Sequence, residues 1–309
     1  MKINESEKLM EYSDFLNYIK EKAAVYAGEE GTADITHIIK NNGLEYDGLV
    51  IMQKGSNISP TIYLNDYYKR YTKGEKLEEL FRSVIDLYEK GKNQKTFDTD
   101  IFKTFNGVKK KIAFKLINYE YNLKLLEKIP HKRIMNLAMV FYCLVEKGEC
   151  GNATALIYNN NMKSWNIGIE ELYEAAMENT PKILQSNLSS MYSILDSFIQ
   201  QGMLDAPDIT EAECGTRNMY ILTNECKLNG AACILYPGVL EEFADSIRSD
   251  LYIIPSSIHE VILIPKDGAM DKNSLTNMVR EVNAEGVPRD EVLSDVVYEY
   301  SRKTQQITL

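Results

Sequence analysis

Apolar residues recur at spacings of three and four in six segments of the chain, which is the pattern of helices with one buried face. The first of these segments places Phe15, Ile19 and Ala23 on such a face. In the third segment, Asn179-Thr180-Pro181 predicts the end of the helix, because a proline disfavours the helical conformation in the residue before it. We therefore expect helices over residues 7–27, 77–88, 169–177, 188–200, 239–247 and 275–282, with a short helical turn from residue 288.

Between these helices, short runs rich in β-branched and aromatic residues are separated by turn residues, which predicts strands joined as hairpins. Asn41-Asn42-Gly43 and Gly55-Ser56-Asn57 are two such turn signals. We expect strands over residues 36–40, 46–53, 61–64, 137–146, 153–159, 219–223, 231–236, 251–254, 261–264 and 296–301. The acidic stretch 205–217 has no apolar period and is expected to form an exposed loop.

The order hairpin and then helix recurs along the chain without a residue-level repeat of fixed period. Hairpins join antiparallel strands, so the pattern predicts an α+β fold with mainly antiparallel sheets and helices packed on one face. At roughly 150 residues per domain, a chain of 309 residues corresponds to about two domains. We expect an N-terminal α+β domain over residues 1–95 and a larger α+β domain over residues 96–309, and a further division near residue 205 stays open.

The balance of charge argues against polyanionic partners. The chain carries 45 acidic and 35 basic residues, a formal net charge of -10, so its average field repels nucleic acid and anionic membranes. A lysine-rich segment from Lys90 to Lys111 lacks interleaved aromatic residues and is interpreted as a solvated face. No apolar run approaches the ~20 residues of a membrane helix. We expect neither a nucleic-acid nor a membrane partner.

The cysteine count and the N-terminal sequence favour the cytoplasm. Five cysteines without a Cys-x-x-Cys pair do not suggest a disulfide framework or a zinc ribbon. The N-terminal residues lack the apolar core of a secretory signal. Three histidines without helical metal-ligand spacing predict no metal site, and the absence of glycine-rich phosphate loops predicts no nucleotide cofactor.

Candidate chemistry is concentrated in the hairpin of residues 250–266, whose turn carries Ser257, His259 and Glu260. Ser257 and His259 would share a face if the stretch were extended, but a nucleophile also needs an oriented base and an oxyanion hole. The turn chemistry of Pro255 and the serines explains the same residues without catalysis, and we favour that interpretation. Cys226, beside a lysine in a polar turn, is a further candidate nucleophile.

A second candidate is a group of tyrosines, Tyr67, Tyr68 and Tyr71, that follows the third predicted strand. Aromatic rings with a polar tip are enriched at protein interfaces, which makes these residues candidates for partner binding. Their helical spacing equally fits the half-buried stripe of a short helix, which is the interpretation we favour.

Several segments resemble a known family. These are 114–118 (Phe-Lys-Leu-Ile-Asn), 129–131 (Ile-Pro-His), 170–172 (Glu-Glu-Leu) with 178–180, 227–231 (Lys-Leu-Asn-Gly-Ala), 251–257 (Leu-Tyr-Ile-Ile-Pro-Ser-Ser) and 282–283 (Val-Asn). Together they resemble an uncharacterised "domain of unknown function" family of Clostridia-type gut bacteria. In element order the chain is also similar, more weakly, to a second uncharacterised family of Bacillus-type bacteria. The resemblance implies a bacterial cytoplasmic protein and brings no known activity or site residue.

The leading hypothesis is therefore a non-enzymatic cytoplasmic module that binds a protein or peptide partner or acts as a scaffold. It rests on the lack of a nucleotide loop, a metal-ligand spacing and a completed catalytic triad in the sequence. The alternative is a hydrolase or transferase with its site at the 255–260 turn, using Ser257, His259 and Cys226.

Overall fold

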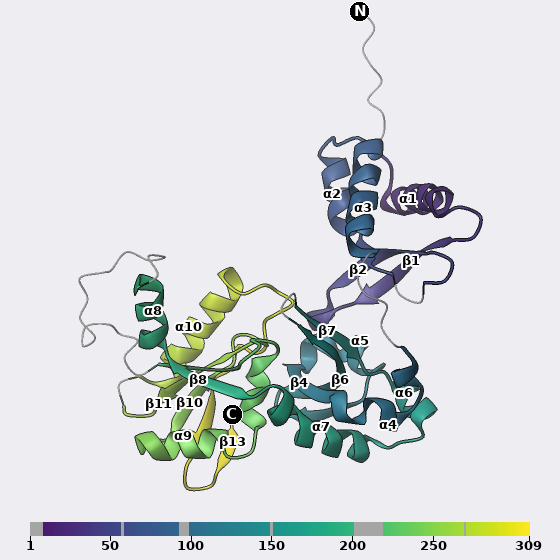
Figure 1. Cartoon of the computed structure of the whole chain (residues 1–309). Coiled ribbons are helices and arrows are strands. Elements are labelled where there is room, and N and C mark those ends of the chain that lie inside the picture. Colours follow the sequence, from purple (N-terminus) through teal and green to yellow (C-terminus); the bar gives the residue numbers. More distant parts are fainter. Residues whose placement is uncertain (1–8, 57–58, 93–98, 149–150, 201–218, 269) are drawn as a thin grey trace, which may run out of the picture. The chain divides into compact units, whose positions relative to one another are not determined.

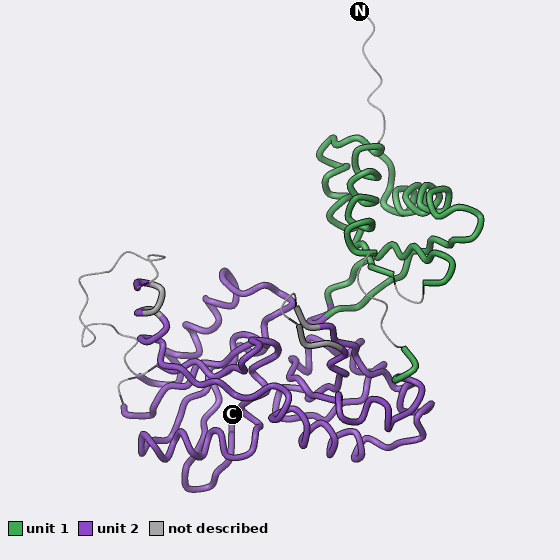
Figure 2. Tube along the Cα trace, viewed as in Figure 1, with its two compact units in different colours: residues 1–40, 44–101 green, residues 41–43, 102–309 purple. Residues whose placement is uncertain are grey.

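The computed structural model describes residues 9–56, 59–92, 99–148, 151–200, 219–268 and 270–309. The chain divides into two compact units (Figure 2): unit 1 comprises Met1–Lys40 and Leu44–Ile101, and unit 2 comprises Asn41–Gly43 and Phe102–Leu309. The predicted domain boundary between residues 95 and 96, the further division near residue 205 and the predicted loop 205–217 all lie outside the described residues.

Unit 1 is a three-stranded antiparallel sheet with helices on one face (Figure 1). Phe15 and Ile19 are four residues apart on one helix and pack with Leu49 of the sheet in a shared core. The sheet order is β1-β2-β3, and the elements are α1 (Tyr12–Ala27), β1 (Thr32–Ile39), β2 (Glu45–Met52), β3 (Thr61–Tyr63), α2 (Asn65–Thr72) and α3 (Leu77–Lys92). The predicted elements of this unit are confirmed, apart from their ends.

The first helix begins later than predicted, at Tyr12 and not at residue 7. The backbone of Met10 is engaged elsewhere: its N–H donates to the Tyr71 hydroxyl at 3.1 Å, and its carbonyl accepts from the Tyr68 hydroxyl at 3.0 Å. These tertiary hydrogen bonds satisfy the N–H and the carbonyl of Met10, so these groups need no partner within a longer helix.

Unit 2 contains two sheets, and the first is built around one long central strand. β6 (Leu137–Gly148) pairs antiparallel with β4 (Ile112–Asn118) on one side, and with β5 (His131–Ile134) and β7 (Gly151–Leu156) in turn on the other. The predicted hairpin of residues 137–146 and 153–159 is confirmed. The helices of this part are α4 (Phe105–Val108), α5 (Leu123–Leu126), α6 (Asn159–Trp165) and α7 (Ile169–Ile183).

The end predicted for α7 is wrong, because the helix continues through Pro181 to Ile183. Contacts with β4 hold the last turn in place. The Thr180 hydroxyl accepts the backbone N–H of Phe114 at 3.1 Å and donates to the Ala176 carbonyl. The Asn179 side chain donates to the carbonyl of Ile112 at 3.2 Å. Tertiary hydrogen bonds thus outweigh the local cost of proline near a helix end.

The second sheet of unit 2 has six strands in the order β13-β12-β10-β11-β9-β8. Helix α10 packs on one face, where Leu275 and Val279 meet Ile254 and Ile264. On the opposite face, the Phe243 ring of α9 lies 4.8 Å from the ring of Tyr220. The elements are β8 (Ser186–Ser190), α8 (Met191–Gln200), β9 (Tyr220–Asn224), α9 (Val239–Ile247), β10 (Leu251–Ile254), β11 (Val261–Pro265), α10 (Lys272–Glu285), β12 (Tyr298–Ser301) and β13 (Gln306–Thr308).

One predicted strand of this region, 231–236, is wrong: residues 231–235 lie in a 3-10 helix, η5 (Gly230–Leu235), and Tyr236 follows its end. Its first five residues are all buried, so the apolar run that suggested a strand reflects burial on every side. The helix predicted over 188–200 starts at Met191, because Leu188 belongs to β8. The short helical turn predicted from residue 288 is confirmed, because the Pro288 carbonyl accepts the N–H groups of Glu291 and Val292. The strand β13 was not predicted.

The α+β class and the antiparallel pairing predicted from the sequence are confirmed, since every strand pairing among the described residues is antiparallel. Within the same part of the chain, no helix is long and apolar enough to cross a bilayer.

Candidate functional site

The hairpin turn predicted as a candidate catalytic site is tied to the chain segment that follows α10. The N–H of Ile258 donates to the Glu291 carbonyl at 2.8 Å, and the N–H of Ser294 donates to the Pro255 carbonyl at 2.9 Å. Ser257 forms an isolated β-bridge with Val292. The turn therefore fixes the position of residues 291–294.

Ser257 and His259 lie close together, but the hydrogen bond between them uses the backbone of His259 and not its ring. The Ser257 hydroxyl accepts the N–H of His259 at 3.0 Å. The imidazole Nδ1 receives the N–H of Asn229 at 3.3 Å, and Nε2 lies 3.8 Å from Glu291 Oε1. No hydrogen bond joins the Ser257 hydroxyl to the ring among the described residues. The hydrolase or transferase alternative, which needs that bond, stays a prediction.

Cys226 lies in the loop between β9 and η5, and it packs beside the buried Tyr142 and Leu184. Its backbone N–H donates to the Asn224 side chain at 3.1 Å. His259 contacts the same loop through the N–H of Asn229, but none of the described hydrogen bonds connects its imidazole to the Cys226 thiol.

The tyrosines predicted as a binding surface lie on α2, and their expected half-buried helical stripe is confirmed. Tyr68 and Tyr71 use their hydroxyls to hold the backbone of Met10. The Arg70 guanidinium lies over the ring of Tyr67, 5.2 Å from the ring centre. Whether these residues bind a partner stays a prediction.

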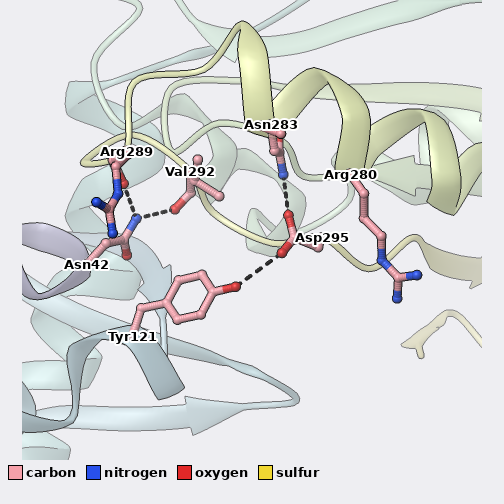
Figure 3. Close-up of a pocket in the computed structure, with 8 residues that line it drawn as sticks. Asn42, Tyr121, Arg280, Asn283, Arg289, Val292 and Asp295 are labelled. Carbon is pink, nitrogen blue, oxygen red and sulfur yellow. Dashed lines mark hydrogen bonds between the residues drawn. The ribbon is translucent and has the colours of Figure 1, made fainter.

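A cavity of about 550 Å³ lies elsewhere, within unit 2 (Figure 3). Helix α10 contributes Arg280, Asn283 and Ala284, which share a helix face because they are three and four residues apart. The segment after α10, which the 255–260 turn holds in place, contributes Arg289, Val292 and Asp295. Two short 3-10 turns complete the wall, η4 (Glu120–Asn122) with Tyr121 and η1 (Asn41–Gly43) with Asn42.

Asn42 stabilises one side of the cavity through hydrogen bonds. Its φ of 57° lies in the left-handed region, which asparagine tolerates better than most residues. The Asn42 amide donates to the carbonyls of Arg289 and Val292 at 2.8 and 2.7 Å. Asn122 completes the arrangement, since its Oδ1 accepts the Asn42 N–H and its Nδ2 donates to Asn42 Oδ1.

Asp295 lies on the floor of the cavity and accepts one hydrogen bond on each carboxylate oxygen. Tyr121 donates to Oδ2 at 3.1 Å, and Asn283 Nδ2 donates to Oδ1 at 2.8 Å (Figure 3). Burial and the neighbouring carboxylate raise the pKa of Tyr121, so its phenol stays a proton donor at neutral pH. Asn283 is only 8% exposed, and its own Oδ1 has no hydrogen-bond partner.

Two cationic side chains frame this floor. Figure 3 shows Arg289 and Arg280 at opposite ends of the cavity, with Asp295 between them. Both side chains are exposed, and neither has an ion-pair partner among the described residues. The cavity therefore offers free guanidinium groups for an anion and the half-buried Asp295 carboxylate for an N–H or O–H donor.

The described residues contain no group of histidine, cysteine and carboxylate side chains that could hold a metal ion. No local pattern predicts the cavity, because α10 and the segment after it meet two 3-10 turns that lie far earlier in the chain. The pattern of Asn41-Asn42-Gly43 predicts a turn alone. The single usable signal is the pair Arg280 and Asn283, polar residues beside the predicted apolar stripe of that helix.

Comparison with known proteins confirms the predicted resemblance to an uncharacterised family. No curated protein and no solved structure has significant similarity to the chain. A family model described as a family of unknown function, DUF5688, matches residues 12–302 and so spans both units. The chain belongs to this uncharacterised family.

Proposed function

We propose that the protein is a non-enzymatic module that binds a protein or peptide partner and holds an anionic group of that partner in the cavity of unit 2. The observation that carries this proposal is the pair of unpaired guanidinium groups, Arg280 and Arg289, at a cavity with a fixed polar floor. Arg70, Arg133 and Arg302 each contact a carboxylate, whereas Arg82 and Arg248 also lack an ion pair among the described residues but do not line this cavity.

A guanidinium group suits this role because its fork of N–H donors matches a carboxylate or phosphate in two parallel hydrogen bonds. Hydrogen bonds to charged groups contribute roughly 1.5–3 kcal/mol each, so two arginines are enough for a specific contact. The rest of the cavity supports preorganised binding, because Asn42 and Asp295 are already held by protein hydrogen bonds.

Tyr67 is the second surface that we propose for the partner. Its hydroxyl has no hydrogen-bond partner among the described residues, unlike those of Tyr68 and Tyr71, so it is free to contact another molecule. We also propose a cytoplasmic location in a bacterial host, which the free thiols of Cys143, Cys226 and Cys233 support.

The test is capture of partners from the native host by the full chain, compared among the wild type and two variants. We expect the double variant Arg280→Gln/Arg289→Gln to lose a partner that the wild type retains. Arg82→Gln/Arg248→Gln is the matched control, because it removes the same two charges from exposed arginines outside the cavity, and Arg82→Gln of α3 alone is the control for a single substitution. A partner that binds Arg280→Gln/Arg289→Gln as well as the wild type would show that the cavity is not the binding site.

A direct measurement complements the capture experiment. Calorimetric titration of the full chain with acetate and with inorganic phosphate should give heat that Arg280→Gln/Arg289→Gln lacks and Arg82→Gln/Arg248→Gln keeps. If neither anion binds and no captured partner depends on the two arginines, the proposal is wrong.

A further inference from the structure

The charges of the cavity alternate in space. Arg289 lies at one end, the Asp295 carboxylate lies in the middle, and Arg280 lies at the other end (Figure 3). A ligand that matches this order presents a negative group, then a positive group or N–H donor, then a second negative group. A single carboxylate or phosphate would leave one arginine and the acidic centre without a partner.

The centre of the cavity is suited to a hydrogen-bond donor. Each oxygen of Asp295 accepts one protein hydrogen bond and keeps capacity for a second. Asn283 holds this carboxylate in place, because its Nδ2 donates to Asp295 Oδ1, while its own Oδ1 is buried and does not face the cavity.

We propose that the ligand is an acidic residue with a free α-carboxylate. Its two carboxylates would contact Arg280 and Arg289, and its α-nitrogen would donate to Asp295. The inference rests on the proposed function and names the chemical class that the same cavity takes.

Two sources present this chemistry. Free glutamate or aspartate brings an ammonium group to Asp295, whereas an acidic residue at the C-terminus of a peptide brings an amide N–H. The cavity of about 550 Å³ lies within the ~300–1,000 Å³ range of sites that enclose a small ligand, so it has room for either.

The test is calorimetric titration of the full chain with a matched series of probes. L-glutamate is compared with glutamine, which lacks the side-chain carboxylate, and with the α-amide of glutamate, which lacks the α-carboxylate. The peptide Ala-Ala-Glu is compared with its C-terminal amide. We expect the probe with both carboxylates to bind at least about tenfold more tightly than either of its amides.

The arginine variants assign the two carboxylates. If Arg280 contacts the side-chain carboxylate, Arg280→Gln binds glutamate and glutamine equally but still distinguishes glutamate from its α-amide. Arg289→Gln then shows the reverse preference, and Arg82→Gln behaves as the wild type. Because both arginines are exposed, neither substitution removes a buried contact of the fold. Free glutamate and Ala-Ala-Glu, measured side by side, identify the source.

Three outcomes decide the inference. Selective loss of one carboxylate preference in each variant supports it. Equal binding of glutamate and both amides overturns it. Arginine-dependent binding of phosphate or of a captured partner, with no binding of any acidic probe at millimolar concentration, also overturns it but leaves the proposed function intact.

Discussion

Gly230 lies at a point of close approach between three segments that support the 255–260 turn. A β-carbon at this position would fall well inside van der Waals contact of Thr223 Oγ1 and the His259 carbonyl oxygen, and 2.8 Å from the Asn224 amide nitrogen. Two of these atoms belong to the backbone and cannot rotate away. We predict that Gly230→Ala lowers the free energy of unfolding by about 3 kcal/mol, measured by urea denaturation.

Gly168→Ala is the control for this substitution. A β-carbon at residue 168 meets only the Glu171 side chain, at 3.7 Å, so we expect a loss below about 1 kcal/mol. Equal losses in the two variants would show that the close approach at Gly230 is not what excludes a side chain.

The hydroxyls of Tyr68 and Tyr71 hold the backbone of Met10, which explains why α1 starts later than the apolar pattern predicts. We predict that Tyr68→Phe and Tyr71→Phe each lower the free energy of unfolding by about 1 kcal/mol, since each removes one hydrogen bond and leaves the ring. Tyr67→Phe should have no measurable effect on the same denaturation curve. A loss for Tyr67→Phe similar to the other two would contradict this assignment.

Helix α7 is joined to the edge of β4 by Thr180, whose hydroxyl accepts the N–H of Phe114. Both groups are buried, so Thr180→Val leaves a backbone donor without a partner. We predict a loss of roughly 1–3 kcal/mol in the free energy of unfolding. Thr180→Ser retains the acceptor and should lose less than Thr180→Val. If the two variants are equally unstable, the missing methyl or the altered helix is responsible rather than the hydrogen bond.

Glu299 of β12 joins two elements, because it contacts Lys266 at 2.5 Å and Lys272 of α10 at 3.0 Å. Lys266 first, and Lys272 in addition, hold the pKa of Glu299 below its ordinary value of 4.5. Glu299 raises the pKa of Lys266 above 10.5. A depressed carboxylate pKa contributes stability that is present above the ordinary pKa and is lost as pH falls through the lower value. A raised lysine pKa contributes stability that is present below 10.5 and is lost as pH rises through the higher value.

We therefore predict that Glu299→Gln is less stable than the wild type between about pH 5 and pH 10, and that the two converge only when the pH falls below the lowered pKa of Glu299. Urea denaturation across this range measures the difference. Glu260→Gln, an exposed glutamate without an ion pair in the described part of the chain, should follow the wild type at every pH. A difference that persists at low pH would have another cause.

Some helices and strands can be predicted from local sequence patterns, and others cannot. Leu251–Ile254 and Val261–Pro265 are confirmed as a hairpin, because a short apolar run between turn residues has few alternatives in an antiparallel sheet. Residues 231–236 were mistaken for a strand because a segment buried on all sides has no diagnostic period. The extension of α7 past Pro181 depends on Asn179 and Thr180 meeting β4, which lies more than sixty residues earlier.

The cavity depends on the whole chain of unit 2 and could not be predicted from local patterns. Asn42 and Val292 are separated by 250 residues and joined by a single amide hydrogen bond. The 255–260 turn, predicted as a possible catalytic site, contributes by holding the segment that carries Arg289 and Asp295. These contacts are tertiary, so no local sequence pattern predicts them.

The net charge of the molecule opposes the charge of the cavity. A formal charge of -10 repels an anionic ligand at long range, while Arg280 and Arg289 attract it only at short range. At about 0.15 M salt the screening length falls to about 8 Å, which weakens the distant repulsion more than the contact. We predict that the association rate of Ala-Ala-Glu does not fall as salt is increased from about 0.01 to 0.15 M. Its dissociation rate should rise over the same range, because salt also weakens the contact with the arginines.

Stopped-flow measurement with a labelled peptide separates the two rates. Ala-Ala-Gln, with one negative charge fewer, is the control and should show the smaller change in association rate. An association rate for Ala-Ala-Glu that falls steeply with salt would mean that the arginines already steer the ligand from a distance. In that case the acidic surface would have to lie away from the mouth of the cavity, because only a locally positive field can overcome a repulsive net charge at that range.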